Sequence, residues 1–111
     1  MAGTTRHHNV TGAITKELLA AGNDYRVSKI SLANVEGTNT VSVDLWIEKQ
    51  YTSRVTRAGL SGKFYFFKDL DIPAGVTLMH NISFDNKADE FSLYVKLTAA
   101  SGTPAVDIIL Y

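Results

Sequence analysis

The sequence predicts an all-β domain, an antiparallel β-sandwich of seven to eight short strands with a jelly-roll or Greek-key-like path. Apolar and polar residues alternate with a period of two in several short segments, and clusters of turn-forming residues separate these segments at regular spacing. No alternation of strands with helical segments supports a parallel sheet. The 111 residues suffice for one hydrophobic core, so we assign residues 11–111 to a single domain and residues 1–10 to an N-terminal arm.

The first part of the chain has the weakest pattern. The arm, MAGTTRHHNV, is small, polar and slightly basic, and we interpret it as a flexible tail or as a segment that orders on a neighbouring subunit. His7 and His8 would point to opposite faces of an extended chain, which is poor geometry for a metal site. For residues 11–21 we predict a strand, with one helical turn as the alternative because Ile14 and Leu18 are four residues apart.

Two strands are expected between residues 25 and 51. In the first, the apolar parity changes between Val27 and Ile30, which is the pattern that a β-bulge produces. The second has the clearest alternation in the chain, with Trp46 on its polar face. The apolar residues of this second strand that we expect to face the core are Val41, Val43, Leu45 and Ile47.

The segment KFYFFKDLDIPAGVTL, residues 63–78, is predicted to form a strand, a tight turn at its proline and glycine, and a second strand. Its first arm carries aromatic residues on both faces, which a strand with one face in water would not do. We therefore expect a partner to cover the second face. The alternation places Phe64, Phe66 and Leu70 on one face and Tyr65 and Phe67 on the other.

Alternation continues in residues 76–84, 91–98 and 105–111, which complete the predicted strands. His80 lies on the apolar stripe of the first of these and is expected to be a packed side chain rather than a ligand. The predicted core contains Val43, Leu45, Phe66, Leu78, Leu93, Val95 and Ile108.

Composition excludes several classes of function. Eleven acidic residues balance eleven basic ones, so no global field favours nucleic acid or an anionic membrane as a partner. The chain has no cysteine, no apolar run long enough to span a bilayer and no visible signal peptide. It also lacks the motifs of a phosphate-binding loop, a zinc protease, a serine hydrolase or a dinucleotide site. We therefore expect no enzymatic activity, no catalytic residue, no metal and no cofactor.

Large side chains on the faces opposite the core predict a homo-oligomer. A monomer that exposed all of them would carry an unusually large apolar patch, and closed cyclic symmetry, such as a trimer or a ring, is the default for such contacts. The edge of the last strand is a further candidate for pairing with a neighbour. The expected interface residues are Trp46, Tyr65, Phe67, Tyr94, Ile109 and Tyr111.

The connection between residues 52 and 62 is long for a small domain. It lies within a stretch that has four basic residues and no acidic one, and we predict that it is a docking loop, with a solvated surface loop as the alternative. The predicted docking residues are Arg54, Arg57 and Lys63.

Three stretches carry a family resemblance: RVSKISLANVEGTNTVSVDLWIEK, FYFFKDLDIPAGVTLMHN and DEFSLYVKLTAASGTPAVDIILY. Together they resemble small virion structural proteins of tailed bacteriophages. The resemblance extends over about residues 9–111. It implies a β-sandwich that decorates or completes a virion and docks on a larger capsid, neck or tail protein, with assembly in the host cytoplasm. Head decoration is favoured over a tail or baseplate accessory, and no catalytic residue is implied.

A second class of function remains open. Trp46, Tyr65 and Tyr94 would also suit a carbohydrate- or ligand-binding β-sandwich, in which exposed aromatic rings form a platform. Such a site needs polar residues beside an exposed ring in a groove, and Asp44 and Glu48 flank Trp46 in the predicted strand.

Overall fold

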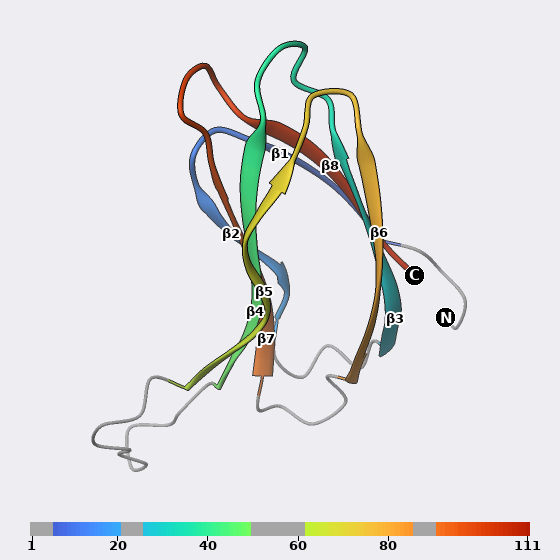
Figure 1. The fold of residues 1–111 in the computed structure, drawn as a ribbon. Coiled ribbons are helices and arrows are strands. Elements are labelled where there is room, and N and C mark those ends of the chain that lie inside the picture. The colour runs from blue at the N-terminus through green and yellow to red at the C-terminus, as the bar shows by residue number, and fades with distance from the viewer. Residues whose placement is uncertain (1–5, 21–25, 50–61, 86–90) are drawn as a thin grey trace.

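The computed structural model describes residues 6–20, 26–49, 62–85 and 91–111, and these residues form eight β-strands (Figure 1). The described part of the chain contains no helix that is long and apolar enough to cross a membrane. The strands are β1 (Arg6–Thr11), β2 (Thr15–Leu19), β3 (Arg26–Asn34), β4 (Val41–Lys49), β5 (Lys63–Ile72), β6 (Thr77–Asp85), β7 (Phe91–Thr98) and β8 (Ala105–Leu110).

The strands form two antiparallel sheets of four. One sheet has the order β1-β8-β3-β6 and the other has the order β2-β7-β4-β5. Figure 1 shows the two sheets facing each other, and the chain passes from one to the other at most of its turns. Eight strands that alternate between two packed sheets in this way define a jelly roll, which confirms the predicted fold class. The last strand, β8, lies between β1 and β3, so the expectation that its edge is free is wrong.

The core lies between the two sheets and consists of the side chains on the inward face of each sheet. Of the seven predicted core residues, Val43, Leu45, Leu93, Val95 and Ile108 are fully buried. The other two, Phe66 and Leu78, are half-buried and pack against the cluster, because they lie on β5 and β6, the end strands of the two sheets. The core also includes Val10, Leu19, Ile30, Leu32, Val41, Leu97, Val106 and Leu110.

The N-terminal residues are more ordered than the sequence indicates. Residues 6–10, which we expected in an extended arm, belong to β1 and pair with β8 along their whole length. Val10 fixes this strand because its side chain is buried in the core. Residues 1–5 lie outside the described part of the chain. In the next segment the strand prediction is confirmed, since Thr15–Leu19 form β2 and pair with β7.

The predicted irregularity in β3 is present. Val27 and Ile30 are both buried although they are three residues apart, and the pairing with β6 shifts between Val27 and Lys29. A bulge allows both side chains to reach the same core, because it breaks the period of two at one point.

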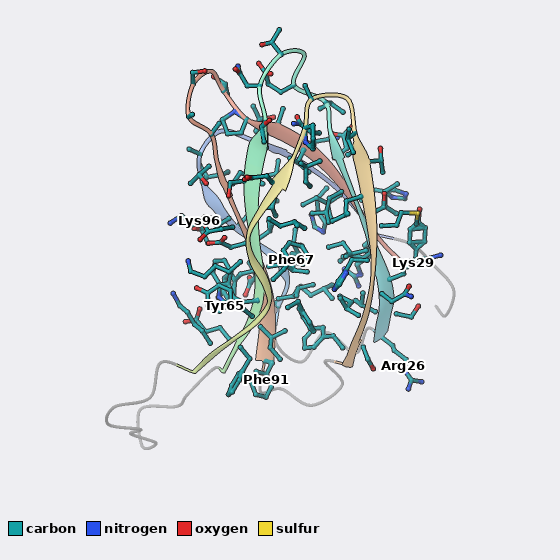
Figure 2. The ribbon with its side chains drawn as sticks, in the orientation of Figure 1. Arg26, Lys29, Tyr65, Phe67, Phe91 and Lys96 are labelled. Carbon is teal, nitrogen blue, oxygen red and sulfur yellow. The ribbon has the colours of Figure 1, made fainter. Side chains whose placement is uncertain are left out.

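Strand β5 departs from the expected alternation. Its pairing with β4 shifts twice, so that Phe67 lies opposite the core residue Leu45 and packs against the core. Figure 2 shows Phe67 between the sheets, whereas Tyr65 projects from the outer side. The expectation that Phe67 shares the outer face with Tyr65 is therefore wrong, because extra residues in β5 reverse the parity.

One of the two register shifts in β5 is stabilised by a hydrogen bond to the neighbouring strand, at Asp69. Asp69 adopts a positive φ of 56°, a left-handed conformation that aspartate tolerates better than most residues. Its backbone N–H donates a hydrogen bond of 2.7 Å to Oδ1 of Asp44 on the neighbouring strand. The side chain of Asp44 thus satisfies a donor that the interrupted ladder would otherwise leave without a partner.

A buried amide joins the two sheets near the β5–β6 turn. Nδ2 of Asn34, in β3, donates to the carbonyl oxygens of Ile72 at 2.8 Å and Asn39 at 3.0 Å, while its Oδ1 accepts from the N–H of Glu36. Ile72 belongs to the opposite sheet, so this side chain links the sheets through hydrogen bonds as well as apolar contact.

The core assignment predicts the effect of truncating Leu93. Leu93→Ala should lower the free energy of unfolding by about 2–5 kcal/mol, because the side chain is fully buried and its loss leaves a cavity. Urea denaturation measures this change. The matched control is Lys96→Ala on the exposed face of the same strand, and equal midpoints for the two variants would contradict the assignment.

His8 provides a second prediction, concerning pH. Its Nε2 is buried without a hydrogen-bond partner among the described residues. Burial lowers the pKa of His8 below its usual 6.5, and the positive charges of Lys16 and Arg6, with a smaller effect of His7, lower the pKa further against the opposing hydrogen bond with the Leu18 backbone. The unfolded chain therefore takes up this proton at a higher pH than the folded protein.

Stability should fall as the pH drops below 6.5, because protons then bind preferentially to the unfolded state. We expect His8→Gln to remove this part of the pH dependence in urea melts between pH 7.5 and 5.5. His7→Gln, on the exposed face of the same strand, is the control. An unchanged pH dependence in His8→Gln would show that the imidazole is not responsible.

Candidate functional site

Three aromatic side chains form a row across the outer face of the β2-β7-β4-β5 sheet. Trp46 of β4 lies opposite Tyr94 of β7 on one side and Tyr65 of β5 on the other. Its ring stacks on Tyr94 with a centroid distance of 5.7 Å and contacts Tyr65 at 5.5 Å. Cross-strand neighbours of this kind interact favourably. We call Tyr94, Trp46 and Tyr65 the aromatic row.

Trp46 is the centre of the row, and its own neighbours cover it. Only 4% of its surface is exposed, its Nε1 donates a hydrogen bond of 3.1 Å to Oε1 of Glu48, and Nζ of Lys63 lies 5.3 Å from its ring centroid. The predicted parity is confirmed, because Trp46 does not point into the core. The expected exposure is wrong, since Tyr65 is the more open ring of the row, with 43% of its surface exposed.

Charged side chains border the row. Nζ of Lys68 lies 5.4 Å from the Tyr65 ring centroid and 3.6 Å from Oδ2 of Asp44. Lys96 lies opposite Asp44 on the next strand, and Figure 2 shows Lys96 on the same side of the sheet as Tyr65. The surface therefore combines flat apolar rings with cations and carboxylates, which suits a partner that offers both apolar and charged groups.

The remaining predicted interface residues lie elsewhere. Phe67 packs into the core, and Ile109 is half-buried on the outer face of the β1-β8-β3-β6 sheet. Tyr111 follows β8, with Nζ of Lys29 5.2 Å from its ring centroid. Figure 2 places Lys29 on the side of the molecule opposite Tyr65. The six residues thus do not form one patch.

The predicted docking loop is described only at its end. Arg54 and Arg57 lie outside the described residues. Lys63 begins β5 and contacts the Trp46 ring, so this cation belongs to the border of the aromatic row.

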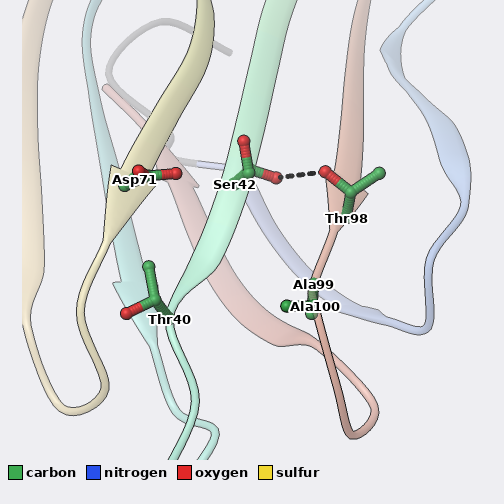
Figure 3. Close-up of a pocket in the computed structure, with 6 residues that line it drawn as sticks. All are labelled: Thr40, Ser42, Asp71, Thr98, Ala99 and Ala100. Carbon is green, nitrogen blue, oxygen red and sulfur yellow. Dashed lines mark hydrogen bonds between the residues drawn. The ribbon is translucent and has the colours of Figure 1, made fainter.

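A shallow hollow of about 460 Å³ lies farther along the same outer face (Figure 3). Its polar groups come from Thr40, Ser42, Asp71 and Thr98, and Oγ1 of Thr98 donates a weak hydrogen bond of 3.4 Å to the Ser42 carbonyl oxygen. Two alanines, Ala99 and Ala100, complete the lining.

This geometry separates the features that a carbohydrate site combines. Among the residues that the structure describes, none that lines the hollow is aromatic, and the central ring of the aromatic row is covered. Within the described part of the chain, no group of three or more histidine, aspartate or glutamate side chains is placed to hold a metal ion.

Some residues of this surface have no signal in the sequence. Lys68 contacts Tyr65 although the two are three residues apart on one strand, because the irregularities of β5 bring them to the same face. The lining of the hollow converges from three strands whose order cannot be read from alternation alone.

Comparison with known proteins gives only distant structural similarities. No family model matches the chain, and no curated protein matches it in sequence. Similar solved structures include one of the infectious bursal disease virus Gx strain, with a TM-score of 0.48, 13% identity and coverage of 96% of this chain. Another is the T13 viral particle of the same virus, with a TM-score of 0.39, 8% identity and the same coverage. The chain spans about a third of those chains, 32% and 30%.

Because Tyr65 and Tyr94 cover Trp46, the structure predicts the emission wavelength and the quenching of this tryptophan. We expect blue-shifted emission that acrylamide quenches weakly in the native protein, because water reaches little of the indole. Tyr65→Ser should shift the emission to longer wavelength and increase quenching, whereas Thr98→Ala, outside the row on the same face, should not. Strong quenching of the native protein would contradict the packing of the row.

Proposed function

We propose that this chain is a non-enzymatic structural component of a tailed-phage virion. In this proposal the chain docks on a larger capsid, neck or tail protein and self-associates as a closed cyclic oligomer. Of the possible places on the virion, we favour head decoration over a tail or baseplate accessory. The phage assignment rests on the resemblance of the three sequence stretches named above. Jelly rolls are common in viral capsids and also in lectins, so the fold is compatible with this role without requiring it.

The aromatic row is the observation that supports docking. Its rings take no part in holding the two sheets together, because they lie on the face of their sheet that points away from the core. Tyrosine and tryptophan are enriched at the centres of protein interfaces, where their truncation costs most. The packing among the three rings also fixes their positions before a partner binds, which lowers the entropic cost of association.

The charge distribution of this chain indicates the chemical character of the partner's surface. Lys63, at the border of the row, is the last of four basic residues that begin at Lys49 with no acidic residue between them. This stretch includes Arg54 and Arg57, the predicted docking residues. We therefore propose that the partner surface is apolar opposite the row and acidic at one border. Such a border steers association and makes it sensitive to salt.

Self-association belongs to the same proposal. The zero formal net charge opposes it little, and homo-oligomers of soluble proteins usually adopt closed symmetry.

Particle binding tests the docking role. The purified chain is added to virions from which it is missing, and the bound copies are counted. We expect the double variant Tyr65→Ser, Tyr94→Ser to bind at least about tenfold more weakly, as truncation of two central interface aromatics implies. Arg54→Glu with Arg57→Glu should weaken binding most at low salt.

The control is Thr15→Ala, an exposed substitution on β2 of the same sheet, which should bind as the unaltered chain does. Equal occupancy by the tyrosine double variant, with its fold intact by circular dichroism, would exclude the aromatic row as the docking surface. Failure of the unaltered chain to bind any part of the particle would overturn the proposed function.

A further inference from the structure

The two sheets have four edge strands, and three of them carry features that oppose pairing with another chain. β1 has six residues and begins with Arg6, while β2 has five residues that include Lys16 and Glu17. β5 is longer but is interrupted twice in its pairing and carries Lys68 and Asp69. Short length, charge and bulges are the usual protections of a free edge.

β6 lacks most of these protections. It has nine residues, contains no proline and carries no charged residue before Asp85. In the described part of the chain it pairs only with β3, and Figure 1 shows it as the outermost strand of its sheet. The shift in its pairing lies beyond Asn81, so residues 77–81 stay in regular register with β3. A regular, uncharged edge is a ready template for an added strand.

We propose that β6 pairs with β6 of a second copy of this chain, antiparallel, about a two-fold axis at Met79. The eight strands of the two β1-β8-β3-β6 sheets would then form one continuous sheet across the dimer. This inference rests on the proposed self-association and specifies its geometry. It uses a different surface from the aromatic row, which remains available for docking.

The sequence of β6 fits this axis. Antiparallel pairing about Met79 places Met79 opposite itself, Leu78 opposite His80 and Thr77 opposite Asn81. No pair within residues 77–81 joins two lysines, arginines or carboxylates, and the polar ends face each other. Two-fold pairing about Met79 therefore brings no like charges together, and two-fold dimers are the commonest closed oligomers.

The pairing also removes exposed apolar surface. Met79 lies opposite Ser31 on the outer face of the sheet, and half of its surface is exposed, at 50%. Two Met79 side chains brought face to face would shield each other, and the flexible thioether adapts to such a contact. On the inner face, half-buried Leu78 would gain a neighbour from the second copy. Backbone hydrogen bonds along residues 77–81 supply the rest of the contact.

Charged substitutions of Met79, the residue at the axis, test the proposal. Met79→Lys should weaken dimerisation by about tenfold or more, because two ammonium groups would face each other across the pair. Met79→Glu should do the same with two carboxylates. A mixture of the two variants should dimerise again, since lysine then faces glutamate. Met79→Leu is the matched control and should dimerise as the unaltered chain does. Sedimentation equilibrium measures all four.

Hydrogen exchange provides an independent readout. Alternate amides of residues 77–81 should become protected as the concentration of the unaltered chain rises, but not in Met79→Lys. Dimerisation of Met79→Lys with unaltered affinity would overturn the proposal, as would a monomeric unaltered chain or a mixture of the charge variants that stays monomeric. Protection of β6 only after addition of a virion protein would also overturn it, because the occupant would then be that protein. Loss of particle binding in the tyrosine variant does not depend on any of these results.

Discussion

The requirement that each sheet bury one face against the other determines most of this structure. Most inward-facing residues of β3, β4, β7 and β8 are almost completely excluded from water, and burial of such side chains is the main favourable contribution to folding. Strands have a period of two, so this requirement also fixes which residues face outward. The aromatic row exists because Trp46, Tyr65 and Tyr94 have the outward parity on three adjacent strands.

Regular alternation explains why much of the fold was predictable. In β4, β7 and β8 the apolar parity runs without interruption, and the predicted inward residues, such as Val43, Leu93 and Ile108, are buried. In β3 the parity change was itself visible in the sequence, because both Val27 and Ile30 are aliphatic. The strand order was not predictable, since alternation describes one strand at a time and pairing depends on the whole chain.

β5 shows where this reasoning fails. Its aromatic residues are compatible with several registers, and nothing in the local pattern shows that the chain gains extra residues opposite β4. One register shift coincides with a contact distant in sequence, the hydrogen bond from the Asp69 N–H to Asp44. The other shift turns Phe67 inward relative to Tyr65, because these two residues pair with consecutive residues of β4, Leu45 and Trp46. The same irregularities bring Lys68 over Tyr65, so the border of the candidate site was as difficult to predict as the fold beneath it.

The candidate surface was predicted in composition but not in arrangement. The outward parity of Trp46, Tyr65 and Tyr94 could be read from three separate strands, whereas their contact required the strand order. The burial of Trp46 has the same origin, because it results from the two tyrosines, Lys63 and Glu48 rather than from the core. Ile109 and Tyr111 were grouped with them by parity alone, yet Ile109 lies in β8 of the other sheet and Tyr111 follows that strand.

The difference between the two sheets has a consequence for assembly. The aromatic row offers side chains on the face of one sheet, whereas β6 offers backbone groups at the edge of the other. Side-chain contacts depend on shape and charge, and backbone pairing depends on an open and regular ladder, so one substitution can weaken either contact without the other. Because the two surfaces share no strand, a subunit paired through β6 keeps its aromatic row free. A dimer would therefore present two rows to a larger particle, and linked binding sites hold a partner more tightly than either site alone.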